Sequence, residues 1–138
     1  TYRILNKCDN ILIYGSRLGI EMSALGKTVI VAGEGFIRNK KIAIDINSKK
    51  EFQDTLSKLP IKEYMNDEKI KRAKKYAYHF FFRRMIELKV LDEFPSEWPN
   101  FRVNKNFFDI LKKKKDKGLE SICDSIINNE NFIFDEIE

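Results

Sequence analysis

The chain has 138 residues and a net charge of +5 at neutral pH, with a pI near 9.1. This length suits one modest domain, and this charge favours acidic partners. No apolar run is long enough to cross a bilayer. The two cysteines, Cys8 and Cys123, are far apart and His79 is the single histidine, so we expect reduced thiols and no metal site. Because the sequence shows no nucleic-acid-binding motif, we expect no nucleic acid partner.

Residues 10–31 predict a strand, a tight turn, a short helix and a second strand. The first apolar run, Asn10–Tyr14, is rich in isoleucine, which is typical of a strand buried on both faces. A second apolar run, Val29–Val31, predicts the next strand. Apolar residues at helical intervals, and a glycine that ends the helix, lie between them: Leu18, Met22, Leu25 and Gly26. The unit is a βαβ motif with a right-handed crossover.

The turn between the first strand and the helix is a candidate anion site. Backbone N–H groups and the helix dipole attract phosphate at such a place, and Gly15 allows a ligand to approach closely. Ser16 either caps the helix or gives its hydroxyl to a phosphate oxygen. Glu21 either accepts hydrogen bonds from ribose or sugar hydroxyls or is a solvated helix residue. Spacing alone leaves these alternatives open.

Several short segments resemble those of one known family. They are Tyr14-Gly15-Ser16-x-x-Gly19-x-Glu21, then Leu25-Gly26-Lys27-x-Val29-Ile30, then Gly33-Glu34-Gly35-Phe36. Together they resemble the capsule polysaccharide biosynthesis glycosyltransferases, a broad family that includes enzymes using CMP-Kdo. Residues 42–48 and the following Glu51 are similar to the strand and Ser-x-x-Glu helix start of that family. The resemblance spans residues 8–59 and weakens through 76–85, while Arg17 and Thr28 depart from the family pattern.

The resemblance implies the C-terminal portion of a GT-B glycosyltransferase, similar to Kdo transferases. In such enzymes this half is Rossmann-like and holds the nucleotide sugar. The implied donor is CMP-Kdo or a UDP-sugar, and the implied acceptor is a glycan or glycolipid. The implied donor-binding residues, with Ser16 on the phosphate and Glu21 near the nucleotide or its sugar, are Gly15, Ser16, Arg17, Gly19 and Glu21. The catalytic base would lie outside this chain, and we expect no cofactor.

The segment after the second predicted strand, residues 32–41, is predicted to be a loop because it contains two glycines and Asn39. It follows the carboxyl end of a strand, where ligands bind in open α/β sheets. The candidate pocket residues on this loop are Gly33, Glu34, Gly35, Phe36 and Arg38. The alternative is a surface loop anchored by Phe36.

A third short strand is predicted at residues 42–46. The capping box from Ser48 to Glu51 starts a helix whose apolar face contains Phe52, Leu56 and Leu59. Pro60 ends this helix, to which we assign no chemistry.

A long helix is predicted from Asp67 to Leu91, with many aromatic and basic residues. It either packs against two neighbours or lies against a membrane surface or an acidic partner. We expect His79 to be packed rather than catalytic. Arg83 and Arg84 are candidates for phosphate or acceptor contacts.

The C-terminal part is predicted to be irregular at residues 94–100, where Trp98 should anchor the chain to the core, and helical from Phe107 and from Leu119. The four lysines of residues 112–115 are either a solvated helix end or a site of attraction to anionic lipid. The acidic tail, residues 128–138, is expected to supply an edge strand or a docking segment around Phe132–Phe134.

These patterns predict an α/β fold: a partial Rossmann-like parallel sheet with flanking helices over residues 1–65, and a helical region over residues 66–138 that packs on it. We expect a piece of a longer, cytoplasmic enzyme that is peripheral to the inner face of the membrane. The predicted function is donor binding in a glycosyltransferase of capsule or surface polysaccharide biosynthesis. The alternatives are a nucleotide-sugar epimerase-like enzyme and a non-catalytic basic interaction module.

Overall fold

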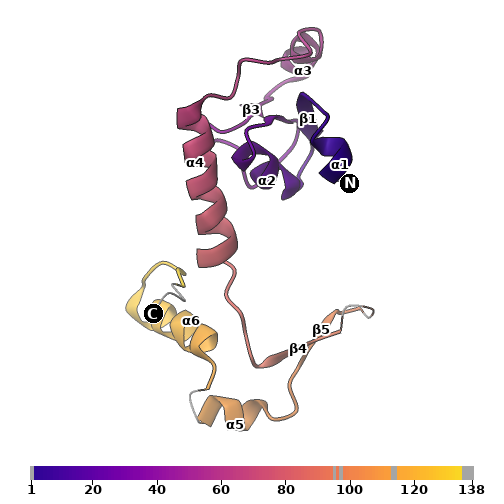
Figure 1. Cartoon of the computed structure of the whole chain (residues 1–138). Coiled ribbons are helices and arrows are strands. Elements are labelled where there is room, and N and C mark those ends of the chain that lie inside the picture. Colours follow the sequence, from indigo (N-terminus) through magenta and orange to yellow (C-terminus); the bar gives the residue numbers. More distant parts are fainter. Residues whose placement is uncertain (1, 95, 97, 113–114, 135–138) are drawn as a thin grey trace. The chain divides into compact units, whose positions relative to one another are not determined.

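The computed structural model describes residues 2–94, 96, 98–112 and 115–134. The chain forms two compact units, Thr1–Tyr78 and His79–Glu138 (Figure 1). The first unit contains the sheet and also helix α4 (Asp67–Tyr78), which packs against helix α2 (Leu18–Ala24). The sequence-based boundary at residue 65 therefore lies inside the first unit.

The first unit is built on a three-stranded parallel sheet. Its strands are β1 (Asn10–Ile13), β2 (Thr28–Val31) and β3 (Ile44–Asp45), in the order β1-β2-β3. Helix α2 connects β1 to β2, and further helices flank the sheet (Figure 1). The predicted mixed α/β fold with a parallel sheet and flanking helices is confirmed.

The apolar core surrounds the central strand β2. All four residues of β2 are buried, because β1 and β3 pair with its two edges and α2 packs against it. Burial of each large aliphatic side chain stabilises the fold by about 1.5–3 kcal/mol. Buried apolar side chains of this core are Ile11, Ile13, Ile20, Met22, Val29, Ile30, Val31, Ile37, Ile42 and Ile46.

Strand β1 is buried on one face only, so the prediction of burial on both faces is wrong. Ile11 and Ile13 are buried, whereas Leu12 is 50% exposed and Tyr14 is 79% exposed. Within the described residues β1 is an edge strand, and alternate side chains of a strand point to opposite faces. An apolar run such as Asn10–Tyr14 is therefore compatible with a strand buried on one face as well as with a strand buried on both.

The end of α2 follows the predicted signal, although its last apolar residue does not pack. Gly26 has a φ of +81°, a left-handed conformation that glycine adopts readily after a helix. Leu25 is exposed, because it occupies the C-cap after Ala24. The helix contributes the predicted Met22 to the core, together with Ile20.

Helix α3 (Lys49–Leu56) begins at the predicted cap. The hydroxyl of Ser48 accepts a hydrogen bond from the backbone N–H of Glu51 at 3.1 Å. The Glu51 carboxylate accepts one from the backbone N–H of Asn47 at 2.8 Å, one residue before the expected partner. The predicted apolar face is only partly covered, since Leu56 is exposed.

Polar contacts hold the segment between α3 and α4 against the sheet. The side-chain amide of Asn10 donates to the carbonyl of Ile61 and accepts from its N–H, both at 2.8 Å. The hydroxyl of Tyr64 donates to the carbonyl of Ala43 at 2.5 Å. Burial, and secondarily the charge of Asp45, raise the pKa of Tyr64 above its ordinary value. These contacts fix where the chain enters α4.

The predicted long helix ends well before Leu91, so that prediction is wrong. Helix α4 ends at Tyr78, and one π-helical turn, His79–Arg83, follows it in the second unit. Beyond that turn, strand β4 (Leu91–Glu93) pairs with β5 (Phe101–Val103) in an antiparallel hairpin. The backbone N–H and C=O groups of residues 91–93 pair with β5, so they are not available for helical hydrogen bonds.

The second unit continues with helices α5 (Phe107–Lys112) and α6 (Lys117–Asn128). The buried carboxylate of Asp116 caps α6 by accepting from Leu119 N–H at 3.0 Å and also accepts from Val90 N–H at 2.9 Å. This side chain ties the start of α6 to the segment before β4.

One further prediction for the second unit is wrong, and another holds for at most one of its two alternatives. Trp98 does not anchor the chain to a core, because it is exposed in the connection between β4 and β5. Of the two alternatives for the tail, the edge strand is not formed by residues 131–134, whereas the docking segment stays open, since Phe134 N–H donates to the carbonyl of Arg83 at 2.8 Å. Lysines 113 and 114 of the lysine run, and tail residues 135–138, lie outside the described residues.

The remaining described helix is α1 (Tyr2–Leu5). Across the described ranges, no helix combines the length and the apolar character that a bilayer span requires.

We predict that Asn10→Ala lowers the free energy of unfolding by about 1–3 kcal/mol, because the polar backbone groups of Ile61 lose their partners. Urea denaturation monitored by circular dichroism measures this change. The matched control is Gln53→Ala, which removes an exposed amide on α3 and should change stability by less than about 0.5 kcal/mol. Equal effects of the two substitutions would contradict the importance of the Asn10 contacts.

We also predict that Gly118→Ala disrupts the second unit. A Cβ at Gly118 would lie 2.0 Å from the carbonyl oxygen of Glu87 and 2.8 Å from a methyl group of Ile86. Relief of this overlap should cost about 1–3 kcal/mol. Amide hydrogen exchange at residues 86–90 should accelerate, whereas Ser121→Ala on the same helix should leave it unchanged. Unaltered protection in Gly118→Ala would refute the close packing.

Candidate functional site

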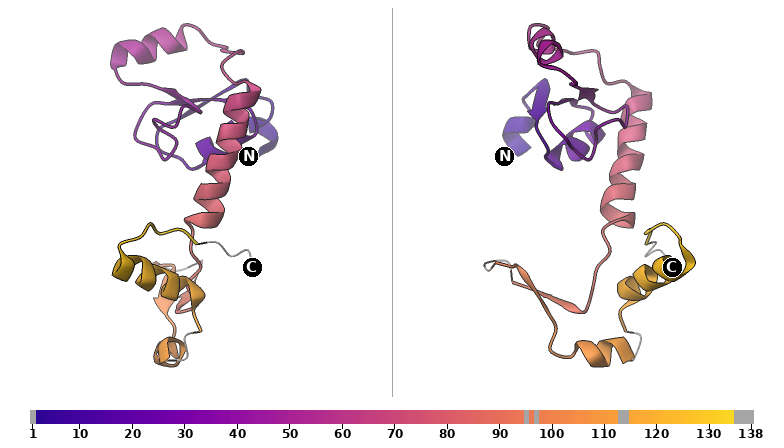
Figure 2. Two further views of the ribbon diagram at one scale, coloured as in Figure 1. Left: turned by 90° about the vertical axis from the view of Figure 1, so that its left-hand side faces the viewer. Right: turned by 180° about the vertical axis from the view of Figure 1, so that it is seen from behind.

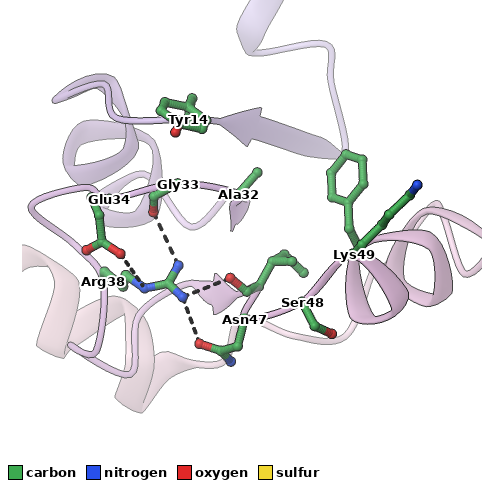
Figure 3. Close-up of a pocket in the computed structure, with 10 residues that line it drawn as sticks. Tyr14, Ala32, Gly33, Glu34, Arg38, Asn47, Ser48 and Lys49 are labelled. Carbon is green, nitrogen blue, oxygen red and sulfur yellow. Dashed lines mark hydrogen bonds and ion pairs between the residues drawn. The ribbon is translucent and has the colours of Figure 1, made fainter.

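All three parallel strands end at one pocket. Tyr14 follows β1, residues 32–34 follow β2 and residues 46–49 follow β3, and their side chains surround a cavity of about 470 Å³ (Figure 3). Ligands of open α/β sheets bind at this carboxyl edge. The lining residues are Tyr14, Ala32, Gly33, Glu34, Arg38, Ile46, Asn47, Ser48, Lys49 and Phe52.

Arg38 connects the two loops that form the pocket wall. Its guanidinium donates to the carbonyl of Gly33 at 3.2 Å, to the carbonyl of Ile46 at 2.8 Å and to the Asn47 side chain at 2.7 Å (Figure 3). The Glu34 carboxylate lies 3.7 Å away but is 94% exposed, so this ion pair contributes little. Because the guanidinium donates to three protein acceptors, Arg38 is held in place as part of the pocket wall.

Two glycines allow the loop after β2 to cross the turn after β1. A Cβ at Gly15 would lie 2.8 Å from the carbonyl oxygen of Glu34, and a Cβ at Gly33 would lie 2.7 Å from the Tyr14 ring. Buried Ile37 anchors the same loop in the core. Gly15 does not line the pocket, but its missing side chain leaves the space that the loop with Glu34 occupies.

The residues of the predicted phosphate turn are not among those that line the pocket. The hydroxyl of Ser16 accepts from Leu18 N–H at 3.2 Å, while Arg17 occupies the N-cap of α2 without a capping side-chain bond. Both Ser16 and Arg17 are exposed. A phosphate bound at this turn would therefore lie beside the pocket and not inside it.

The two predicted site residues on α2 have other partners. Gly19 is buried, and a Cβ there would lie 2.4 Å from an Ile13 methyl group and 3.1 Å from one of Ile37. The Glu21 carboxylate accepts from the Tyr2 hydroxyl at 2.5 Å, and this hydrogen bond raises the pKa of Tyr2. Close helix–sheet packing accounts for Gly19.

The predicted pocket loop contributes three of its five residues to the lining: Gly33, Glu34 and Arg38. Gly35 and Phe36 do not line the pocket. The Phe36 side chain is exposed, and its carbonyl accepts from the Tyr76 hydroxyl of α4. This contact ties the outer part of the loop to α4.

Sequence reasoning missed the pocket residues that follow the third strand. The sequence predicts only a structural role for Ser48, Lys49 and Phe52, in the capping box and on the apolar face of the helix, and none for Asn47, yet all four line the pocket. The rule that ligands gather at the carboxyl ends of parallel strands applies equally to β3 and would have identified them. Tyr14 was noticed within a motif and assigned no role.

The polar lining has two distinct sides. Lys49 and the amino end of α3 supply positive potential on one side, and Glu34 supplies an exposed carboxylate on the side of Arg38 (Figure 3). Within the described residues, no group of three or more His, Cys, Asp and Glu side chains is arranged to hold a metal ion. The arrangement suits reversible binding of an anionic, hydroxyl-bearing molecule.

Comparison of the chain with protein-family models, curated proteins and solved structures finds no match. The fold and the pocket define it as an α/β chain with a ligand-sized cavity at the carboxyl edge of a parallel sheet.

We predict that Gly15→Ala displaces the pocket loop, because the new methyl group would meet the Glu34 carbonyl. Amide chemical shifts of residues 32–38 should change, and ligand binding at the pocket should weaken. The matched control is Gly35→Ala, whose Cβ would have ordinary contacts of 3.6 Å and longer. Similar spectra for both variants would contradict the tight crossing at Gly15.

Proposed function

We propose that the first unit is the nucleotide-sugar-binding part of a GT-B glycosyltransferase that builds capsule or surface polysaccharide. The observation that carries this proposal is the convergence of the three strand ends on one pocket. The β1-α2-β2 unit is the arrangement expected of a Rossmann-like half. The motifs between residues 8 and 59 support the same family and favour CMP-Kdo or a UDP-sugar as donor.

The chemistry of the lining suits each part of such a donor. Lys49 and the first N–H groups of α3 can bind phosphate, since the amino end of a helix attracts anions. The Asn47 amide and the Glu34 carboxylate are suitable partners for ribose or sugar hydroxyls. Tyr14 and Phe52 offer aromatic surface to a base.

The turn at Ser16 and Arg17 remains a second candidate for the phosphate. Its two side chains are exposed, and it follows β1 at the same edge of the sheet as the pocket. The Ser16 oxygen accepts a local hydrogen bond, which leaves its hydroxyl proton able to donate. A donor that spans the pocket could place one phosphate at each position.

The proposed reaction transfers the sugar from the donor to a glycan or glycolipid acceptor. This unit contributes electrostatic stabilisation of the departing phosphate through Lys49 or the Ser16–Arg17 turn. The general base for the acceptor hydroxyl comes from a part of the enzyme outside this chain. The proposal invokes neither a metal nor an organic cofactor.

Two alternatives predict different outcomes. A nucleotide-sugar epimerase would use a similar phosphate-binding turn but would convert the donor without an acceptor. A non-catalytic basic interaction module is favoured by the net charge of +5 and would bind no nucleotide. Nucleotide binding separates the module from both enzymes, and the acceptor requirement separates the enzymes from each other.

We predict that the 138-residue chain binds CMP, CDP or UDP and that Lys49→Ala weakens binding roughly tenfold, as loss of a charge-assisted contact would. Isothermal titration calorimetry measures the affinities. The matched control, Lys50→Ala, removes the neighbouring exposed lysine, which does not line the pocket, and should have little effect. Ser16→Ala and Arg17→Ala test the turn separately. If none of these nucleotides binds, the proposal fails.

A further inference from the structure

The guanidinium of Arg38 is a largely buried positive charge without a buried counter-ion. The side chain is 13% exposed, and it donates three hydrogen bonds, to the carbonyls of Gly33 and Ile46 and to the Asn47 side chain. All three acceptors are neutral oxygens, so they satisfy N–H groups without balancing the charge. A buried charge is costly unless an opposite charge pairs with it. The wall of the pocket therefore contains a cation that favours an anion beside it.

The carboxylate that pairs with Arg38 is a weak partner. Among the residues that the structure describes, Glu34 supplies the one carboxylate that forms an ion pair with Arg38, with 3.7 Å between its Oε1 and the Arg38 Nε. This distance is longer than a hydrogen bond, and the Glu34 side chain is 94% exposed. Water screens an exposed carboxylate, so the pair contributes little. Glu34 can therefore leave Arg38 at little cost.

Arg38 also has N–H groups left for a ligand. A guanidinium has five N–H groups. Nη2 donates to Ile46 and Asn47, and Nη1 donates to Gly33, which leaves one N–H on Nη1 and the Nε–H beside Glu34. An anion oxygen in the pocket can accept from Nη1, and also from Nε once Glu34 has moved. Hydrogen bonds between a guanidinium and an oxyanion are charge-assisted, so they are stronger than those to neutral oxygens.

Both members of this ion pair lie on the segment between β2 and β3, in the first unit (Figure 2). Both line the cavity of about 470 Å³, which is a size typical of small-ligand pockets. Figure 3 shows the guanidinium between Gly33 and Asn47, with Glu34 at one side. The hydrogen bonds that Arg38 donates do not involve Glu34, so they hold the guanidinium in place when Glu34 moves. A cation held in this way is preorganised for a ligand.

We propose that Arg38 binds the anionic group of the pocket's ligand, a phosphate or a carboxylate, and that Glu34 is a counter-ion that this group displaces. An anion inside the cavity is less screened by water than the exposed Glu34 carboxylate, so its attraction to Arg38 is stronger. The displaced Glu34 carboxylate then accepts a hydrogen bond from a hydroxyl group of the ligand. The pocket therefore selects ligands that carry an oxyanion near hydroxyl groups.

This inference rests on the proposed function only in placing the ligand in the same pocket. That proposal assigns phosphate contacts to Lys49 and to the turn of Ser16 and Arg17, and Arg38 adds a contact that is already held in place. An inorganic anion can bind Arg38 whether or not the natural ligand is a nucleotide. The two proposals can therefore fail separately.

NMR titration of the full 138-residue chain with inorganic pyrophosphate tests the inference at about 0.05 M salt, where screening is weak. We expect shifts of the Arg38 Nε–H resonance and of the amides of residues 33–34 and 46–47, from which the dissociation constant follows. A second titration with malonate, a dicarboxylate, distinguishes the two kinds of anion. Tighter binding of pyrophosphate identifies a phosphate subsite, and tighter binding of malonate identifies a carboxylate subsite.

Glu34→Gln tests the displaced counter-ion while Arg38 stays intact. This change should tighten pyrophosphate binding about threefold, because the competing carboxylate is gone. The matched control is Asp54→Asn, which removes the same charge from an exposed position on α3 outside the pocket lining and should have a much smaller effect.

Arg38→Gln removes the proposed anion contact and should weaken pyrophosphate binding at least about tenfold. Its matched control is Lys58→Gln, which removes a positive charge from an exposed position outside the pocket lining and should have little effect. Because the Glu34 side chain is exposed, Glu34→Gln remains a decisive test even where Arg38→Gln disturbs the loops.

Two results would overturn the inference. One is the absence of shifts at Arg38 with both anions, and the other is an equal effect of Glu34→Gln and Asp54→Asn, which a general change of charge would explain. Shifts at Arg38 with pyrophosphate, but no binding of CMP, CDP or UDP, would support the inference and refute the proposed function. Nucleotide binding that Arg38→Gln does not weaken would support the proposed function and refute the inference.

Discussion

The burial of β2 between two parallel partners is the constraint on which the first unit depends. Each residue of β2 is buried, and its pairing with β1 and β3 in the same direction brings three strand ends to one edge. The segments that leave these ends must share that edge, so they form a common pocket. The hydrophobic core thus determines the position of the candidate site before any polar residue contributes.

Polar contacts and glycines then determine the shape of the pocket. Arg38 bridges the loop after β2 and the segment after β3, while Gly15 and Gly33 let backbone and ring approach closely at the loop crossing. The buried side chain of Ile37 anchors the same loop in the apolar core. An arginine held in this way provides a preformed wall, which lowers the conformational cost of binding a ligand.

The second unit is organised differently. Asp116 and the close packing at Gly118 connect α6 to the segment before β4, whereas many of its large apolar side chains remain exposed. The first unit therefore has a buried apolar core with a pocket at its edge, whereas the second unit leaves apolar side chains exposed.

The sequence by itself determined the features that local physics controls. These are the βαβ order, the helix end at Gly26, the cap at Ser48 and the loop that carries Gly33, Glu34 and Arg38. Each depends on the spacing of apolar residues along a short segment or on the conformational preference of a single residue. Both can be read from a few consecutive residues.

Only the tertiary structure decided which faces are covered and which loops meet. Four features depend on how distant segments pack: the exposed face of β1, the end of α4 at Tyr78, the exposed Trp98, and the contribution of Asn47 and Lys49 to the pocket. Apolar patterns show that a side chain can be buried, but burial also requires another element beside it. That requirement involves residues far apart in the chain, so no local pattern contains it.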